Sequence, residues 1–197
     1  RPLGISGIFD LERLEHLALG DNPFDSAPLP TFSLVRLSAL RDLSLRQASL
    51  SGTIPSAIGL LRNLVLLDLS GNRLVGSLGS EIGQMPRLRF LLLNDNEGLI
   101  QDVPLSVQSM SLLEVVTLQG TSFQGNLDAM CSTTRQSLVV VADCDEISCP
   151  CCALCCAGSV GCPDASLLSP FDPTWETRFE RTVYQFRGVV ALDVIAS

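Results

Sequence analysis

A leucine motif that recurs at a nearly constant interval constrains the fold of this chain more than any other feature. Each copy reads L-x-x-L-x-L, and successive copies begin 26, 24, 24, 25 and 23 residues apart. The copies are Leu14-Leu17-Leu19, Leu40-Leu43-Leu45, Leu64-Leu67-Leu69, Leu88-Leu91-Leu93, Leu113-Val116-Leu118 and the degenerate Gln136-Val139-Val141. A unit of this length cannot bury its apolar face alone, so we expect the copies to stack on one another around a continuous core.

Within each copy, apolar and variable residues alternate with a period of two, which is typical of a strand with one buried face. Stacked neighbours then form a parallel sheet with the leucines directed inward. Three residues after each triplet stand Asn22, Ala48, Asn72, Asn96, Thr121 and Cys144. An asparagine there predicts hydrogen bonds to the backbone of the neighbouring copy. Alanine cannot make these bonds, and threonine or cysteine can make them only in part.

The residues after the second triplet read Leu50-x-Gly52-x-Ile54-Pro55-x-x-Ile58-Gly59, and the third and fourth copies echo this string. The string L-x-G-x-I-P-x-x-I-G resembles the plant-specific class of leucine-rich repeats, as in receptor-like protein ectodomains and polygalacturonase-inhibitor-like proteins. The resemblance covers roughly residues 4 to 144. It implies a leucine-rich-repeat solenoid with short parallel strands on the concave face and 3₁₀ or extended pieces on the convex face. It also implies an extracellular or cell-surface recognition module that has passed through the secretory pathway.

The pattern divides the chain into three parts. Residues 1–130 hold the repeats, residues 131–162 hold the last degenerate repeat and a cysteine-rich cap, and residues 163–197 form a tail whose structure the pattern does not define. The chain begins inside a repeat, so we expect its N-terminal end to be truncated or processed. A signal peptide, a membrane span or a kinase domain in flanking sequence stays an open question.

All eight cysteines lie in one short segment, at Cys131, Cys144, Cys149, Cys151, Cys152, Cys155, Cys156 and Cys162. An even, tight cluster indicates a disulfide framework in a secreted protein and a metal site in a cytosolic one. Two overlapping C-x-x-C pairs have zinc-type spacing, but no histidine lies nearby. We therefore expect a disulfide-bonded cap without metal or cofactor, and a structural or zinc-binding cap is the alternative.

Charge and motif content exclude several other functions. A net charge of -8 argues against nucleic-acid binding, which relies on concentrated Lys and Arg. No apolar stretch is long enough to span a bilayer. The sequence has no nucleophile elbow, no phosphate-binding glycine loop and no H-E-x-x-H motif, and its single histidine is His16. These features predict a protein that binds a protein or peptide and is not an enzyme, with an inhibitor of a secreted hydrolase as a variant of that role.

The variable strand positions define the predicted ligand surface, because solenoids bind through their concave side. The predicted contact residues are Asp42, Arg46, Leu66, Asp68, Phe90, Leu92, Asn94, Val115, Thr117 and Gln119. The N-terminal half of this surface is polar, and the C-terminal half carries an apolar stripe that continues to Leu138 and Val140. We expect the stripe to be exposed, with Phe90 as its anchor. In the alternative, the tail folds back through Phe171 and Trp175 and covers the stripe.

Overall fold

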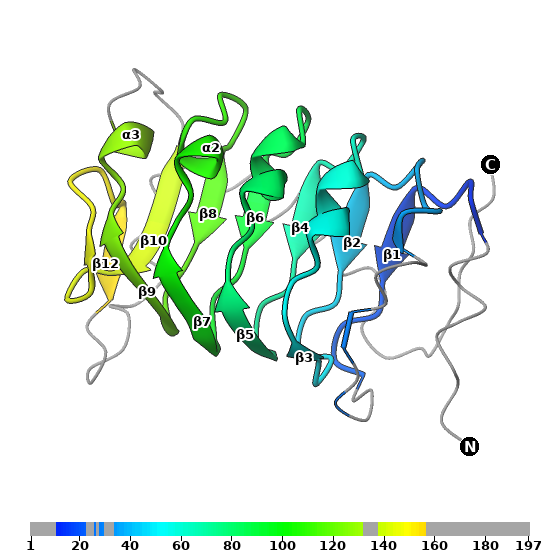
Figure 1. Cartoon of the computed structure of the whole chain (residues 1–197), viewed down its shortest axis with the longest axis horizontal. Helices are drawn as coiled ribbons and strands as arrows, with labels where there is room; N and C mark the ends of the chain where they lie inside the picture. Colours follow the sequence, from blue (N-terminus) through cyan, green and yellow to red (C-terminus); the bar gives the residue numbers. More distant parts are fainter. Residues whose placement is uncertain (1–10, 23–25, 27, 30–33, 132–137, 157–197) are drawn as a thin grey trace.

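The computed structural model describes residues 11–22, 26, 28–29, 34–131 and 138–156. Each repeat contributes one short strand to a single seven-stranded sheet (Figure 1). Its strands, in spatial order, are β1 His16–Ala18, β2 Asp42–Ser44, β4 Leu66–Asp68, β6 Phe90–Leu92, β8 Val115–Thr117, β10 Val139–Asp143 and β12 Leu154–Cys156. All neighbouring strands pair in parallel, which confirms the predicted leucine-rich-repeat solenoid.

After β2, β4, β6, β8 and β10 the chain turns into a second structural layer (Figure 1). This layer is a second parallel sheet, formed by β3 Ser51–Gly52, β5 Arg73–Ser77, β7 Asn96–Asp102, β9 Thr121–Asn126 and β11 Ile147–Ser148. Within the described residues, helical pieces follow in four successive coils: η2 Ser56–Leu60, η3 Ser80–Gln84, α2 Leu105–Gln108 and α3 Asp128–Cys131. The sequence predicted the 3₁₀ pieces. It described the segments of the second sheet only as extended, because strand pairing between coils is a tertiary property.

The solenoid interior is filled by the repeated aliphatic residues. Leu43, Leu67, Leu91, Val116 and Val140 occupy equivalent positions on successive strands, and each is 0 % exposed. Burying an aliphatic side chain of this size stabilises the fold by about 1.5–3 kcal/mol. Since each column residue packs on its neighbours, one polar substitution disturbs at least two coils.

Two asparagines form the predicted ladder between coils. The Asn72 Oδ1 accepts hydrogen bonds from the backbone N–H groups of Ala48 and Leu50 at 3.0 and 2.9 Å. Its Nδ2 donates to the Leu45 and Leu69 carbonyls, both at 2.8 Å. Asn96 repeats the arrangement one coil later, where its Nδ2 donates to the carbonyl oxygens of Leu69 and Leu93 and its Oδ1 accepts from the Leu74 N–H. These bonds satisfy backbone groups that the turn would otherwise bury without partners.

The register predicted for the sixth repeat is wrong by one residue. Val140 pairs with Val116, so the sequence interval between equivalent core residues of the fifth and sixth strands equals that of a regular repeat. Val140 and Ala142 point into the core. Val139 and Val141 take the concave positions that the sequence assigned to Leu138 and Val140. The error has a physical origin, because a run of consecutive valines hides the alternation that marks one face of a strand.

The parallel sheet continues one strand beyond the last repeat. Strand β12 pairs with β10, with Leu154 beside Val141 and Cys156 beside Asp143. The Ala153 N–H donates to the Val140 carbonyl at 2.9 Å, which seats β12 on the open edge. The cysteine-rich segment therefore covers the last strand of the repeats by adding a strand of its own.

A candidate binding surface on the concave sheet

The concave face is the side of the seven-stranded sheet that is directed away from the leucine core. Strand register aligns its side chains in two lateral rows. One row runs His16, Asp42, Leu66, Phe90, Val115 and Val139, and the other runs Ala18, Ser44, Asp68, Leu92, Thr117 and Val141. Most of the predicted contact residues are thus brought into one continuous surface across the coils.

The N-terminal end of the concave face is built from polar and charged side chains that contact one another. The His16 ring lies against the Asp42 carboxylate, with 2.5 Å between Nδ1 and Oδ2. The Arg46 guanidinium lies 3.5 Å from the Asp21 carboxylate at the end of the preceding coil. His16 is exposed while Asp42 is half-buried, so this end of the surface offers charge and hydrogen-bonding groups to solvent.

Asp68 lies at the boundary between the polar and the apolar halves, and its side chain is fully buried. Its carboxylate accepts hydrogen bonds from the Ser44 hydroxyl at 3.0 Å, and from the Ser70 hydroxyl and backbone N–H at 2.6 and 3.1 Å. Burial raises the pKa of the Asp68 carboxyl above its ordinary value, although these hydrogen bonds and the nearby Arg46 charge oppose the shift. The sequence placed Asp68 on this face, but its complete burial is a finding of the structure.

The C-terminal half of the concave face is apolar, as the sequence predicted, but its side chains are buried and not exposed. Leu66, Leu92 and Val115 are between 3 and 8 % exposed, and Phe90 is half-buried beside them. They form one cluster with Val139, Val141, Leu154 and Cys156. The tail residues Phe171 and Trp175, which the alternative hypothesis places over this stripe, lie outside the described residues.

Two residues after each member of the second row stand Gly20, Arg46, Ser70, Asn94, Gln119 and Asp143, which are polar apart from Gly20. The Thr117 hydroxyl donates to the Asn94 side-chain oxygen at 2.8 Å. Among the described residues, the Gln119 Oε1 is buried and lacks a hydrogen-bond partner. A buried acceptor without a donor costs free energy, so this atom favours a donor supplied from outside the described residues.

Three disulfides join the cysteines of the cap. They are Cys131–Cys151, Cys144–Cys155 and Cys149–Cys152. Cys156 is also disulfide-bonded, and Cys162 lies outside the described residues. The predicted disulfide cap is confirmed for this part of the chain. The spacing of the cysteines alone did not show which of them pair.

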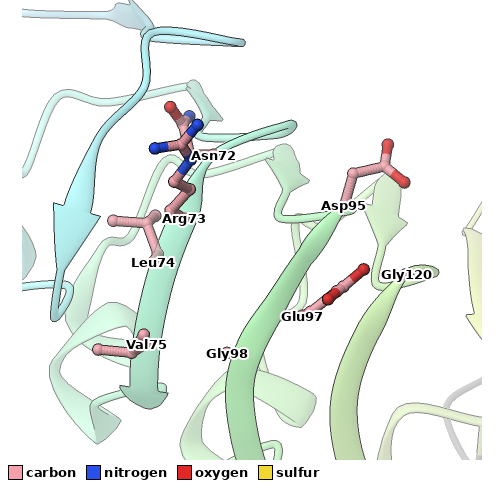
Figure 2. Close-up of a pocket in the computed structure, with 8 residues that line it drawn as sticks. All are labelled: Asn72, Arg73, Leu74, Val75, Asp95, Glu97, Gly98 and Gly120. Atoms are coloured by element: carbon pink, nitrogen blue, oxygen red, sulfur yellow. The ribbon is translucent and has the colours of Figure 1, made fainter. Parts of the chain in front are cut away.

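A shallow hollow lies on the second sheet, where the sequence indicated no site (Figure 2). Its volume is about 460 Å³, and it is lined by Asn72, Arg73, Leu74, Val75, Asp95, Glu97, Gly98 and Gly120. The Arg73 guanidinium borders it from β5, and two carboxylates border it from β7 and the turn before it. The only sequence signal for this hollow was the charged residues at variable positions of two neighbouring coils.

In the part of the chain that the structure describes, no helix has both the length and the apolar character that crossing a bilayer requires. The helical pieces that are described have four or five residues.

Comparison with known proteins agrees with the repeat geometry. A family model described as Leucine Rich Repeat matches residues 63–85. Over 122 residues the chain is 36 % identical to the receptor-like kinase TMK2 of Arabidopsis thaliana, which corresponds to 59 % of this chain and 14 % of that protein. These matches agree with the resemblance of the repeats to plant-type leucine-rich repeats. Because this leucine-rich-repeat protein spans only that small share of its relative, kinase activity does not follow from the match.

Solved structures similar to this leucine-rich-repeat protein include two complexes. The structure of PEPR1-AtPEP1 superposes with a TM-score of 0.61 at 34 % identity, covering 70 % of this chain and 18 % of that chain. The plant peptide hormone receptor RGFR1 in complex with RGF2 gives a TM-score of 0.62 at 29 % identity, covering 73 % and 22 %. The present chain thus spans less than a quarter of each matched chain.

Proposed function

We propose that this leucine-rich-repeat protein is a non-enzymatic recognition module that binds a peptide or protein across its concave face, outside the cell or at its surface. The observation that carries the proposal is the pair of side-chain rows, which change from charged groups at Asp42 to apolar groups at Phe90 on one rigid sheet. A surface of this kind, presented by successive coils, suits an extended ligand that crosses the strands.

Two further observations support this role. The cap is joined by disulfides, which persist in oxidising compartments such as the secretory pathway and the cell exterior. One similar structure is of a plant peptide hormone receptor, RGFR1, in complex with RGF2. In this chain, Phe90 would serve as the apolar anchor of a ligand, and the free Gln119 Oε1 would accept a ligand N–H group after a small side-chain movement.

The test uses peptides selected from a displayed random library on the immobilised wild-type chain, with affinities then measured by calorimetry. Phe90→Ala should weaken binding of the selected peptides by at least about tenfold, because apolar anchors dominate such interfaces. Leu105→Ala is the matched control, since Leu105 is a large exposed apolar residue on the helical side of the solenoid. It should leave binding unchanged.

The thermal melt of Phe90→Ala separates binding from packing. We expect its midpoint to stay close to that of the wild-type chain, because Phe90 is only half-buried. A large loss of stability together with unchanged peptide affinity would refute the proposed surface and favour a stripe that is covered by the chain itself.

A further inference from the structure

The cap contains a cluster of sulfur atoms that recognition through the concave face does not use. The Sγ atoms of Cys131, Cys149 and Cys151 lie within 4.8 Å of one another. Cys152 is bonded to Cys149, so a fourth sulfur adjoins the same cluster. The four atoms belong to two adjacent disulfides, one of which joins α3 to the segment between β11 and β12.

We infer that these four cysteines form a redox-gated metal site, which is closed by two disulfides when oxidised and binds one Zn²⁺ ion through four thiolates when reduced. Tetrahedral zinc with Zn–S bonds of about 2.3 Å places its sulfur ligands roughly 3.8 Å apart. Three of the four sulfurs already lie within 4.8 Å of one another. Reduction has to separate the two bonded pairs from 2.07 and 2.05 Å to that spacing, which is a movement of roughly 1.7 Å.

The donor set selects the class of metal. Four thiolates are soft ligands that favour zinc and similar ions, whereas calcium and magnesium require oxygen donors. Cys149 and Cys152 pack against the main hydrophobic core, which keeps part of the site away from water. Because Cys131 comes from α3 and the other three residues from one short loop, a bound ion would link the same two segments that the Cys131–Cys151 disulfide links.

The chemistry requires a reductant, and a phosphine supplies it in a balanced way. Each disulfide takes up two electrons and two protons and becomes two thiols, while the phosphine becomes a phosphine oxide with oxygen from water. Zn²⁺ or Co²⁺ then displaces the thiol protons as the thiolates coordinate, so up to four protons leave per metal ion bound.

The experiment titrates Co²⁺ into the full chain after reduction with a water-soluble phosphine in the absence of oxygen. We expect the visible d–d absorption of tetrahedral cobalt thiolate, saturation at one ion per chain, and displacement by Zn²⁺. Cys131→Ser should weaken binding by at least about tenfold, because it removes the ligand that α3 contributes. Cys144→Ser is the matched control, since Cys144 belongs to a different disulfide, and it should bind Co²⁺ as the wild-type chain does.

Thiol alkylation followed by mass spectrometry provides a second readout that does not depend on the variants folding. In the reduced, zinc-loaded chain, Cys131, Cys149, Cys151 and Cys152 should be protected from alkylation, while Cys144 and Cys155 react. Equal binding by the Cys131→Ser variant, an octahedral cobalt spectrum, or uniform reaction of all the thiols would each overturn the inference. None of these outcomes bears on ligand binding at the concave face, so the two proposals fail independently.

Discussion

Replacing Asn72 by alanine removes the most highly connected side chain of the inter-coil ladder. Its Oδ1 accepts from the N–H groups of Ala48 and Leu50, and its Nδ2 donates to the carbonyl oxygens of Leu45 and Leu69. Ala48 stands at the asparagine position of the preceding coil and has no polar side chain to compensate. The substitution therefore leaves two buried N–H groups without the acceptor that they have in the native fold.

The magnitude follows from the desolvation of those two groups. A buried donor without a partner costs about 1–3 kcal/mol, so Asn72→Ala should lower the free energy of unfolding by about 2–6 kcal/mol. A domain is stabilised by only about 5–15 kcal/mol in total. We therefore expect a large fall in the midpoint of urea unfolding, measured by circular dichroism at a fixed temperature, with little change in the slope of the transition.

Asn22→Ala is the matched control for this experiment. Asn22 occupies the equivalent position in the first coil, but within the described residues its Nδ2 donates to the Leu19 and Gly20 carbonyl oxygens of its own coil, at 3.3 and 2.9 Å. Its loss should cost about 1 kcal/mol or less, because carbonyls near the end of the solenoid can turn to water. Equal effects of the two substitutions, or a loss below about 1 kcal/mol for Asn72→Ala, would refute the claim that bridging between coils is what stabilises the stack.

Three further substitutions test the core, the buried carboxylate and the cap. Leu67→Asp places a charge at a fully buried position and should abolish the cooperative thermal transition, whereas Leu105→Asp at an exposed site should leave it intact. Because burial raises the Asp68 pKa, the native state binds more protons than the unfolded state as the pH rises above the ordinary carboxyl range. Stability should therefore fall with increasing pH in that window, and Asp68→Asn should remove this slope in urea titrations at a series of pH values. Serine at Cys131 opens a disulfide with a sequence separation of 20 from Cys151, and it should lower the free energy of unfolding by about 3 kcal/mol in non-reducing urea titrations.

Much of the solenoid was predictable because its information is local and repeated. In the five regular copies, the leucine spacing fixed the strand positions, the inward direction of residues such as Leu67, and the hydrogen-bonding role of Asn72 and Asn96. Each copy shows the same alternation of apolar and variable residues, so an error in assigning the register of one copy does not affect the others. The sixth copy shows the limit, since its adjacent valines carry no alternation, and only pairing with Val116 sets the register of Val140.

The repeat period, the leucine core and the concave residues of the five regular repeats could be derived from the amino-acid pattern, because they follow from which face of a strand each side chain occupies. Only the tertiary structure decided how the cysteines pair, that the extended segments join into a second sheet, and that Asp68 and Leu66 are buried. These properties depend on which segments meet in space. Two residues with the same position in a repeat can therefore differ completely in exposure, as His16 and Leu66 do in one row.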